Sequence, residues 1–351
     1  MFPSQRHLKC AMLLFLSSGA LLQPFAAKAA SCKTQSQMTA AERDALSSTA
    51  RRIVGEVQRG DILALRQDTT PTVASDFAGI ASSVDMLKPL VQQAAITVDS
   101  LYALDSSTDT AGAARTDFYC GTQIVVLNFT DLPPGTYALA ILHATGVPKP
   151  QQISLILSET AEHRWMLGGF YRKPMIEAGH DGLWYWESAR AYAQRSMNWD
   201  AWFYYRVAAY TLQPVDFLSS PNLEKLQNEA DRVHPDNLPD TKALMLSAHG
   251  SVFQVTTIDT TALFGPLDLE VHYVPDTAQS AELRNPQSAR KQVTEVMMAV
   301  LALHPELHDA FHGFWVQADQ GATVAFSLEL PMDQIGPGMQ SPTTTSSCIA
   351  Q

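Results

Sequence analysis

The sequence predicts an α+β protein built from several modules, and three patterns in its 351 residues lead to this fold class. Between residues 39 and 94, apolar side chains recur at helical spacing. Residues 97–172 change to short runs rich in Val, Ile, Tyr and Phe, separated by turn residues, which is typical of strands. Residues 252–330 again contain strands, which flank one amphipathic helix. Helices followed by an antiparallel sheet make an α+β layer.

Residues 1–30 predict a secretory signal peptide. Arg6 and Lys9 precede an uncharged, Leu-rich stretch, and Ala27-Lys28-Ala29 supplies the small alternating residues that signal peptidase requires. The apolar stretch is too short to span a bilayer, and no later segment reaches about 18 consecutive apolar residues, so we expect no transmembrane segment. The mature protein is therefore expected to be exported to a periplasmic or extracellular location.

The charge of the chain is strongly acidic. Removal of the three cations in the signal takes the formal net charge from −11 to −14. A surface with this balance repels phosphate backbones at long range, so nucleic acid is not an expected partner. The length exceeds what one core usually organises and predicts two or three domains.

Three cysteines, Cys32, Cys120 and Cys348, remain after the signal is removed. One of them must stay unpaired within the monomer, and an oxidising compartment permits a disulfide whose connectivity the sequence does not specify. Cys32 also follows Ala29-Ala30-Ser31, which is a poor match to a bacterial lipoprotein box, so a lipid anchor at Cys32 is not expected.

Residues 38–175 are predicted to form the first α+β domain. A capping box of Thr39 and Glu42 begins a helix that Gly60 ends, and two further helical stretches follow, the last from about residue 76 to residue 94. Short connections between the strands predict antiparallel neighbours. The strands are expected near 97–104, 118–129, 136–143, 152–159 and 164–172.

This first domain resembles the NTF2-like (cystatin-related) families. The resemblance rests on the helix that ends in Gly60-Asp61, on Ile62 to Leu65, on Pro71 and on the later run of strands. It implies a long helix packed in the hollow of a curved sheet. Such domains carry binding pockets as well as isomerase or dehydratase sites, so the resemblance leaves the function open.

Residues 176–243 are predicted to be helical, with a dense group of aromatic side chains between Trp184 and Tyr210. The spacing resembles one tetratricopeptide (TPR) unit, which is a helical hairpin, and a further helix is expected from Ser220-Pro221. A single unit must bury its faces against neighbouring elements. The residues that match the repeat are Tyr185, Ala189, Tyr192, Ala201, Tyr205, Ala208 and Pro214.

Residues 244–334 predict a ββαββ module. Strands are expected over 252–259, 267–274, 314–318 and 323–330, with an amphipathic helix from Pro286 to Leu303. Residues 335–351, which are rich in Pro, Gly, Thr and Ser, are expected to be a disordered tail.

Two sets of residues are candidate binding groups. Trp202, Phe203 and Tyr204 are consecutive, so on a helix they point in different directions and do not all face one partner helix. Either the hairpin lies between the two α+β units, which we favour, or some of these rings form an exposed binding surface. His143 ends a strand and is either a rim or edge residue of the first sheet or a polar group at the mouth of a pocket, where a carboxylate partner would make it an acid or base.

His304, His308 and His312 have a spacing that would align three imidazoles on one continuous helix. Pro305 interrupts that helix, so we expect only His308 and His312 to share a face, in the last turn of a short helix before Gly313. We therefore predict neither a metal site nor another cofactor.

The chain lacks the common catalytic motifs. It contains no G-x-S-x-G, G-x-x-x-x-G-K-[ST], G-x-G-x-x-G, H-E-x-x-H or C-x-x-C pattern, which disfavours the familiar hydrolases, nucleotide-using enzymes and zinc proteases. The favoured function is an exported, non-catalytic protein that binds a protein, peptide or cell-envelope partner. The alternative is a small-molecule enzyme of the isomerase, dehydratase or hydrolase type, with its pocket in the first sheet and His143 among its residues.

Overall fold

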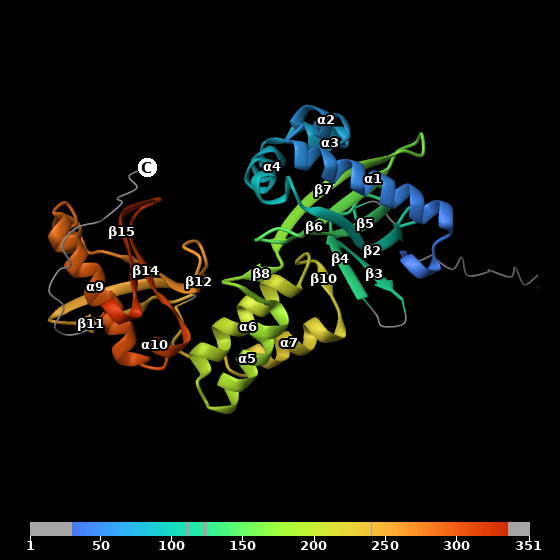
Figure 1. Ribbon diagram of the computed structural model, residues 1–351. Coiled ribbons are helices and arrows are strands. Elements are labelled where there is room, and N and C mark those ends of the chain that lie inside the picture. The colour runs from blue at the N-terminus through green and yellow to red at the C-terminus, as the bar shows by residue number, and fades with distance from the viewer. Residues whose placement is uncertain (1–29, 110–111, 122–124, 240, 336–351) are drawn as a thin grey trace, which may run out of the picture.

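The computed structural model describes residues 30–109, 112–121, 125–239 and 241–335 (Figure 1). The predicted signal peptide and the predicted tail lie outside these residues, apart from Ala30 and Ile335. Ile335 is buried against the hydrophobic core. Helices and antiparallel sheets both occur in quantity, which confirms the α+β class.

The N-terminal helices begin and end where local signals predict. Helix α1 (Ala40–Arg59) has Thr39 as its N-cap, with a complete capping box to Glu42, and it ends at Gly60 in the left-handed conformation with φ 67°. Three further helices follow: α2 (Ile62–Gln67), α3 (Pro71–Ser75) and α4 (Ala78–Val91).

The N-terminal sheet has five strands in the order β1-β2-β5-β6-β7, and all neighbouring strands are antiparallel. Helix α1 packs on one face of the sheet, where Ile53 and Val54 lie in the same core as alternate residues of β5, namely Ala138, Ala140, Leu142 and Ala144 (Figure 1). This interior is mainly apolar, although it also buries Glu56 of α1, which pairs with Arg52. The strands are β1 (Ser31–Thr34), β2 (Ala95–Asp105), β5 (Thr136–Thr145), β6 (Gln151–Glu159) and β7 (Trp165–Pro174).

The predicted strand 118–129 is two strands. β3 (Arg115–Cys120) and β4 (Val125–Thr130) form an antiparallel pair, because Gly121 at φ 69° begins a turn. With β10 (Leu218–Ser219) they make a small sheet separate from the N-terminal sheet. A disulfide between Cys32 on β1 and Cys120 on β3 joins the two sheets. The sequence alone did not specify which cysteines pair.

The helical region contains the expected hairpin. Asp181 caps α5 (Gly182–Gln194) by accepting a hydrogen bond from the backbone of Trp184, and α6 (Asn198–Leu212) returns against α5. Two short strands precede the hairpin, β8 (Ile176–Glu177) and β9 (His180–Asp181). Ser220 caps α7 (Pro221–Asp231), as its Ser-Pro start predicts.

The C-terminal sheet has the strand order β11-β12-β13-β14-β15. Strands β13 and β14 are parallel, and three helices form the crossover connection that a parallel pair requires. The strands are β11 (Leu244–Ala248), β12 (Ser251–Thr261), β13 (Asp268–Val274), β14 (Gly313–Gln320) and β15 (Thr323–Pro331). The crossover helices are α8 (Thr277–Glu282), α9 (Pro286–Leu303) and α10 (Leu307–Ala310).

The predicted ββαββ module thus gains a first strand, β11, and two short helices. A two-residue turn, His249-Gly250, joins β11 to β12 with φ values of 48° and 86°. Positive φ at both positions is typical of tight hairpins. This turn was the sequence signal for the strand that the prediction missed.

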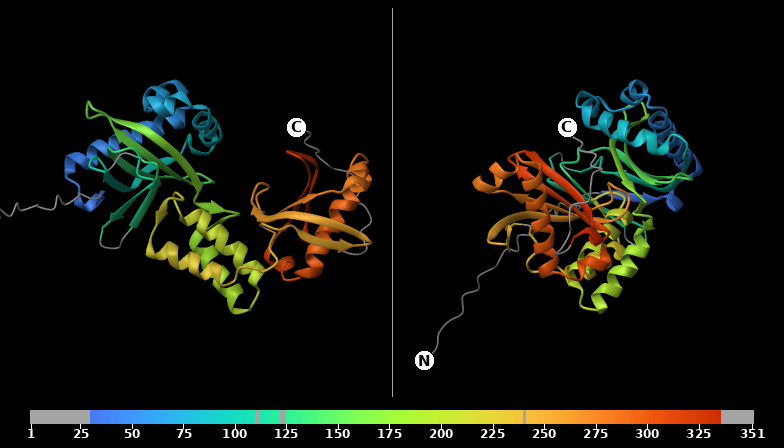
Figure 2. Two further views of the ribbon diagram at one scale, coloured as in Figure 1. Left: turned by 180° about the vertical axis from the view of Figure 1, so that it is seen from behind. Right: turned by 60° about the vertical axis from the view of Figure 1, so that its left-hand side comes forward.

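The helical region and the C-terminal sheet share one hydrophobic core. Side chains of α6, including Phe203 and Tyr205, belong to the same buried cluster as α9 and the inner face of the C-terminal sheet. At its other end, the helical region contributes Val215 and Leu218 to the core beneath the small sheet. The helices therefore lie between the two sheet-containing parts (Figure 2).

Candidate functional site

The candidate site is one face of the C-terminal sheet. The inner face of this sheet is apolar and packs on α9. We call the opposite face the acidic face. It carries five carboxylates on the four neighbouring strands β12, β13, β14 and β15, and strand pairing places them side by side. They are Asp259, Asp268, Glu270, Asp319 and Glu329.

The acidic face has almost no compensating positive charge. Strands β11 to β15, all of which the structure describes, contain no Lys and no Arg. One cation reaches the face from outside the sheet, since Arg206 on α6 forms an ion pair of 2.9 Å with Asp259. A group of carboxylates with so few cations attracts positively charged ligands.

A histidine in the middle of the acidic face contacts two carboxylates. His272 lies with Nδ1 at 3.0 Å from Asp319 and Nε2 at 3.2 Å from Glu270. Gln317 donates a hydrogen bond of 2.6 Å to the same Glu270 oxygen. An imidazolium ring can donate to both carboxylates, whereas a neutral ring can donate to only one. About a quarter of each of the His272, Glu270 and Asp319 side chains is exposed, so solvent reaches this network.

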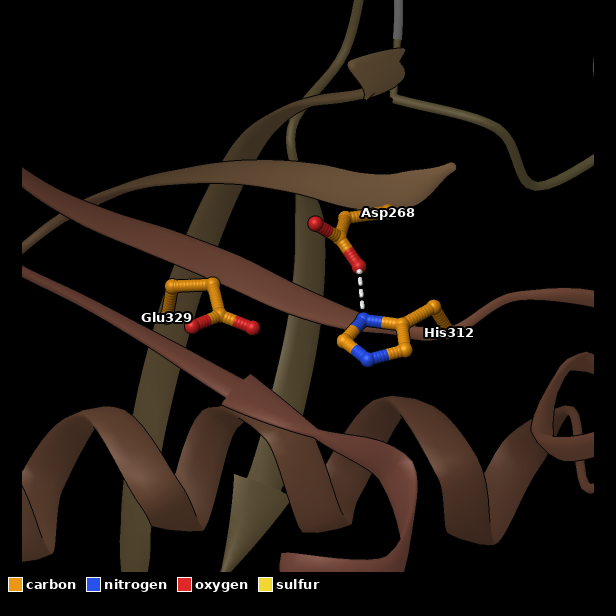
Figure 3. A group of neighbouring side chains, drawn as sticks. All are labelled: Asp268, His312 and Glu329. Carbon is orange, nitrogen blue, oxygen red and sulfur yellow. Dashed lines mark hydrogen bonds and ion pairs between the residues drawn. The ribbon is translucent and has the colours of Figure 1, made fainter. Parts of the chain in front are cut away.

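A second group of ionisable side chains lies at one end of the acidic face (Figure 3). Asp268 begins β13, His312 directly precedes β14, and Glu329 is near the end of β15. His312 Nδ1 is 2.9 Å from Asp268 Oδ1, and one ligand atom from each of the three residues lies within 4.8 Å of the others. In Figure 3 the Glu329 carboxylate points toward the Asp268–His312 pair. These are the described residues that come close enough together to hold a metal ion.

Burial determines the protonation of this group. The Asp268 side chain is fully buried, and burial raises the pKa of its carboxyl, although His312 and the backbone amide of Gly313 act in the opposite direction. Burial, and then repulsion by Asp268, raises the pKa of Glu329. Burial thus favours the protonated form of both carboxyls. Chemically the three residues can bind a cation, or Asp268 can orient the His312 ring for proton transfer at Nε2.

His143 lies on the expected strand but not in a pocket against α1. It projects from the face of β5 opposite the face that packs on α1, because Ala138, Ala140, Leu142 and Ala144 take the helix side. Its nearest carboxylate is Asp99, at 3.9 Å, and both side chains are partly exposed. The pair is a surface contact of a histidine with an acid.

Trp202, Phe203 and Tyr204 are all buried, with exposed fractions of 8%, 0% and 6%. Helix α6, which carries them, lies between α5, α7 and α10, so rings that point in different directions all pack against other side chains. Phe203 and Tyr204 both contact Phe311, at 5.8 Å between ring centroids. The three rings are part of the core in this structure and do not form an exposed surface.

The three histidines near the end of α9 are separated. His304 is the C-cap of α9 and lies against Trp199, with ring centroids 4.0 Å apart and the rings tilted by 31°. The expectation that His308 and His312 share a helix face is wrong, because α10 ends at Ala310 and the chain is already extended at Phe311. The His308 ring pairs with its exposed neighbour Asp309, while His312 reaches Asp268.

A separate cavity of about 420 Å³ lies where β7 meets the end of α6. Lys173 lines it and forms an ion pair of 2.6 Å with Asp216, and its ammonium group lies over the Tyr210 ring. The charge of Lys173 is thus already paired, and the cavity holds one further cation, Arg172, but no group of carboxylates like that of the acidic face.

Comparison with known proteins adds no identification. No protein-family model matches the chain, and neither a curated protein nor a solved structure matches it. None of the helices in the described residues is long and apolar enough to cross a membrane. Fold and site together define an α+β protein with an acid-rich sheet face.

The order of residues in two strands indicates a polar sheet face, which the sequence-based choice of site residues did not include. In Asp268 to Tyr273, acidic or histidine residues alternate with apolar ones, which is typical of a strand with one polar face. In Val316 to Asp319, the polar residues Gln317 and Asp319 likewise alternate with apolar ones. The alternation alone does not say which strands are neighbours, so it does not bring Asp268, His312 and Glu329 together.

Proposed function

We propose that the protein is an exported, non-catalytic binding protein that holds a Lys- and Arg-rich segment of a partner protein on the acidic face. The observation that carries the proposal is the concentration of five carboxylates on a sheet whose strands contain no Lys and no Arg. Basic segments are drawn to such a face at long range and form ion pairs with it at contact. Nucleic acid is not a partner of this face, because its phosphates carry the same charge.

The apolar filling of the N-terminal domain supports the non-catalytic reading over an enzyme with a pocket in the first sheet. The space between α1 and the N-terminal sheet is occupied by buried aliphatic side chains, including Leu46, Ile53 and Leu142. His143, the residue proposed for acid or base chemistry, belongs to the other face. An NTF2-like origin of this domain and a TPR-like origin of the helical hairpin remain part of the proposal, as structural units that hold the acidic face.

The Cys32–Cys120 disulfide supports export. Disulfides persist in oxidising compartments and are rare in the cytosol, and the order of residues before Ala30 fits a cleaved signal. The same bond opposes a lipid anchor at Cys32, since a sulfur bonded to Cys120 is not available for acylation. Sequencing the N-terminus of the exported product tests this part, and an intact Met1 on a cytoplasmic protein would contradict it.

Binding of a defined cation-rich probe tests the acidic face. The probe is a fluorescent octalysine peptide, and its affinity is measured by anisotropy at two salt concentrations with the mature chain. We expect binding that weakens with salt, and about tenfold weaker binding for the double variant Glu270→Gln, Asp319→Asn, because each exposed ion pair contributes roughly 0.2 to 1 kcal/mol.

The matched control removes two exposed carboxylates elsewhere. Asp44→Asn with Asp85→Asn makes the same change in net charge on α1 and α4, where both residues are exposed. This variant should bind octalysine as the parent does. Equal losses in the two double variants, or no binding by the parent at low salt, would contradict the proposed site.

A further inference from the structure

We propose that Asp268, His312 and Glu329 form a binding site for one divalent transition-metal ion, of which Zn²⁺ is the representative. The inference does not rest on binding of a basic partner. It starts from three ligand-bearing side chains whose ligand atoms lie within 4.8 Å of one another (Figure 3). One imidazole with two carboxylates is a donor set that such ions accept.

The strand arrangement fixes the position of all three residues. Leu269 pairs with Phe314 across the parallel β13–β14 contact. Asp268 directly precedes Leu269, and His312 lies two residues before Phe314, so both residues are at this end of the contact. Glu329 pairs with Trp315 on the other side of β14. Gly313 allows the strands to approach here, since a Cβ at that position would lie 2.4 Å from the carbonyl oxygen of Leu330. The site therefore sits on the rigid frame of the sheet.

An unpartnered buried oxygen points to a missing cation. Asp268 is 0% exposed, and while Oδ1 faces His312, its other oxygen, Oδ2, has no hydrogen-bond partner among the described residues. A buried carboxylate oxygen without a donor is costly, and native proteins satisfy nearly all such atoms. A metal ion beside Asp268 would supply the missing interaction.

The charge of the group also fits a dication. Two carboxylates and a neutral imidazole carry a formal charge of −2, and no Lys or Arg is present on the five strands to balance it. The group is therefore short of nearby positive charge. A bound dication would neutralise the group and remove that shortage.

The donor set selects among ions. Ca²⁺ and Mg²⁺ prefer six or more oxygen ligands, whereas Zn²⁺ binds nitrogen and oxygen with three protein ligands and one open position. His312 is 44% exposed, which leaves the solvent side of the site open. Ligand atoms around such an ion lie roughly 3 to 3.5 Å apart, so the partly exposed Glu329 side chain must move inward by about 1 to 2 Å on binding.

Calorimetric titration of Zn²⁺ into the untagged, EDTA-treated mature chain tests the site, with Ca²⁺ titrated in parallel. We expect one Zn²⁺ per chain and much weaker Ca²⁺ binding. Glu329→Gln and His312→Gln should each weaken Zn²⁺ binding at least tenfold, because each removes one of three ligands. Both residues are partly or largely exposed, so these variants are expected to fold.

The control variant is His308→Gln, which removes an exposed histidine four residues away whose ring pairs with Asp309. It should bind Zn²⁺ as the parent does. Substitution of Co²⁺ adds a readout of coordination, since the visible absorption of the parent complex should be lost or altered in His312→Gln. Absence of Zn²⁺ binding by the parent, or equal affinity in the parent, Glu329→Gln and His312→Gln, would overturn the proposal.

Discussion

The hydroxyl group of Tyr204 on α6 donates a hydrogen bond of 2.7 Å to the backbone carbonyl of Ala310 at the end of α10. The two residues are 106 positions apart in the chain, and the bond is buried. It joins the helical hairpin to the crossover between β13 and β14, close to His312. The hairpin is thus attached to the sheet that carries the acidic face.

Tyr204→Phe removes this bond together with the interaction of the Tyr204 hydroxyl with Tyr192. The ring stays, but the Ala310 carbonyl loses its buried donor, so we expect a loss of about 1 to 2 kcal/mol in the free energy of unfolding. Urea denaturation measures it. Tyr210→Phe on the same helix, where the residue is 47% exposed, is the control and should leave the midpoint unchanged. A midpoint for Tyr204→Phe equal to that of the parent would mean that the bond contributes nothing.

Tyr205→Ala should destabilise the chain more strongly. Its side chain is 2% exposed and belongs to the core shared by the hairpin and the C-terminal sheet, so truncation should cost roughly 3 to 5 kcal/mol. Tyr210→Ala removes the same atoms from an exposed site and should cost clearly less. Ala208→Trp should overpack the same contact, because Ala208 is fully buried. If both core variants unfold at the parent midpoint, the aromatic rings are not the structural joint of the molecule.

Asp200 should make stability fall as pH rises. The side chain is fully buried near the start of α6 and neither carboxylate oxygen has a hydrogen-bond partner among the described residues. Burial, with repulsion by Glu306 as a smaller cause, raises the pKa of Asp200 to about 7. The unfolded chain has a pKa near 4 at this residue. Its contribution is therefore complete below about pH 4 and is lost as pH rises toward 7, a change on the order of 4 kcal/mol.

Asp200→Asn isolates this effect, because an amide does not titrate. The difference in unfolding free energy between variant and parent should increase between pH 4 and pH 7 in favour of the variant, and should then level off. Other carboxyls contribute equally to both proteins and cancel in the difference. A difference that stays constant over this range would show that Asp200 has an ordinary pKa.

Reduction of the Cys32–Cys120 bond should destabilise the N-terminal domain. The bond closes a loop between residues 88 positions apart and joins β1 to the small sheet, so its loss should cost about 2 to 5 kcal/mol. Thermal unfolding with and without dithiothreitol measures the effect. The double variant Cys32→Ala, Cys120→Ala should unfold at the lower temperature in both conditions. A melting temperature of the parent that reductant does not change would mean that the bond does not support the fold.

Features with local causes were predictable from the sequence. Thr39 and Gly60 determine the start and the end of α1, and Asp181 and Ser220 determine the starts of α5 and α7. Each cap is a hydrogen bond or a backbone conformation within a few residues. The alternation of polar and apolar residues located most strands for the same reason. The predicted strand 118–129 was too long because β3 ends at Cys120, directly before Gly121, whose φ of 69° is left-handed.

Contacts between distant segments could not be predicted in this way. The choice of Cys120 as the partner of Cys32, and the burial of Trp202, Phe203 and Tyr204, depend on which elements pack together. The acidic group depends on the parallel pairing of β13 with β14, which brings Asp268 and His312 together from 44 positions apart. Amino-acid order thus determines the elements and their polar and apolar faces through short-range interactions. Only the packed chain decides which faces meet, because that choice depends on the free energy of burying side chains that are far apart in the sequence.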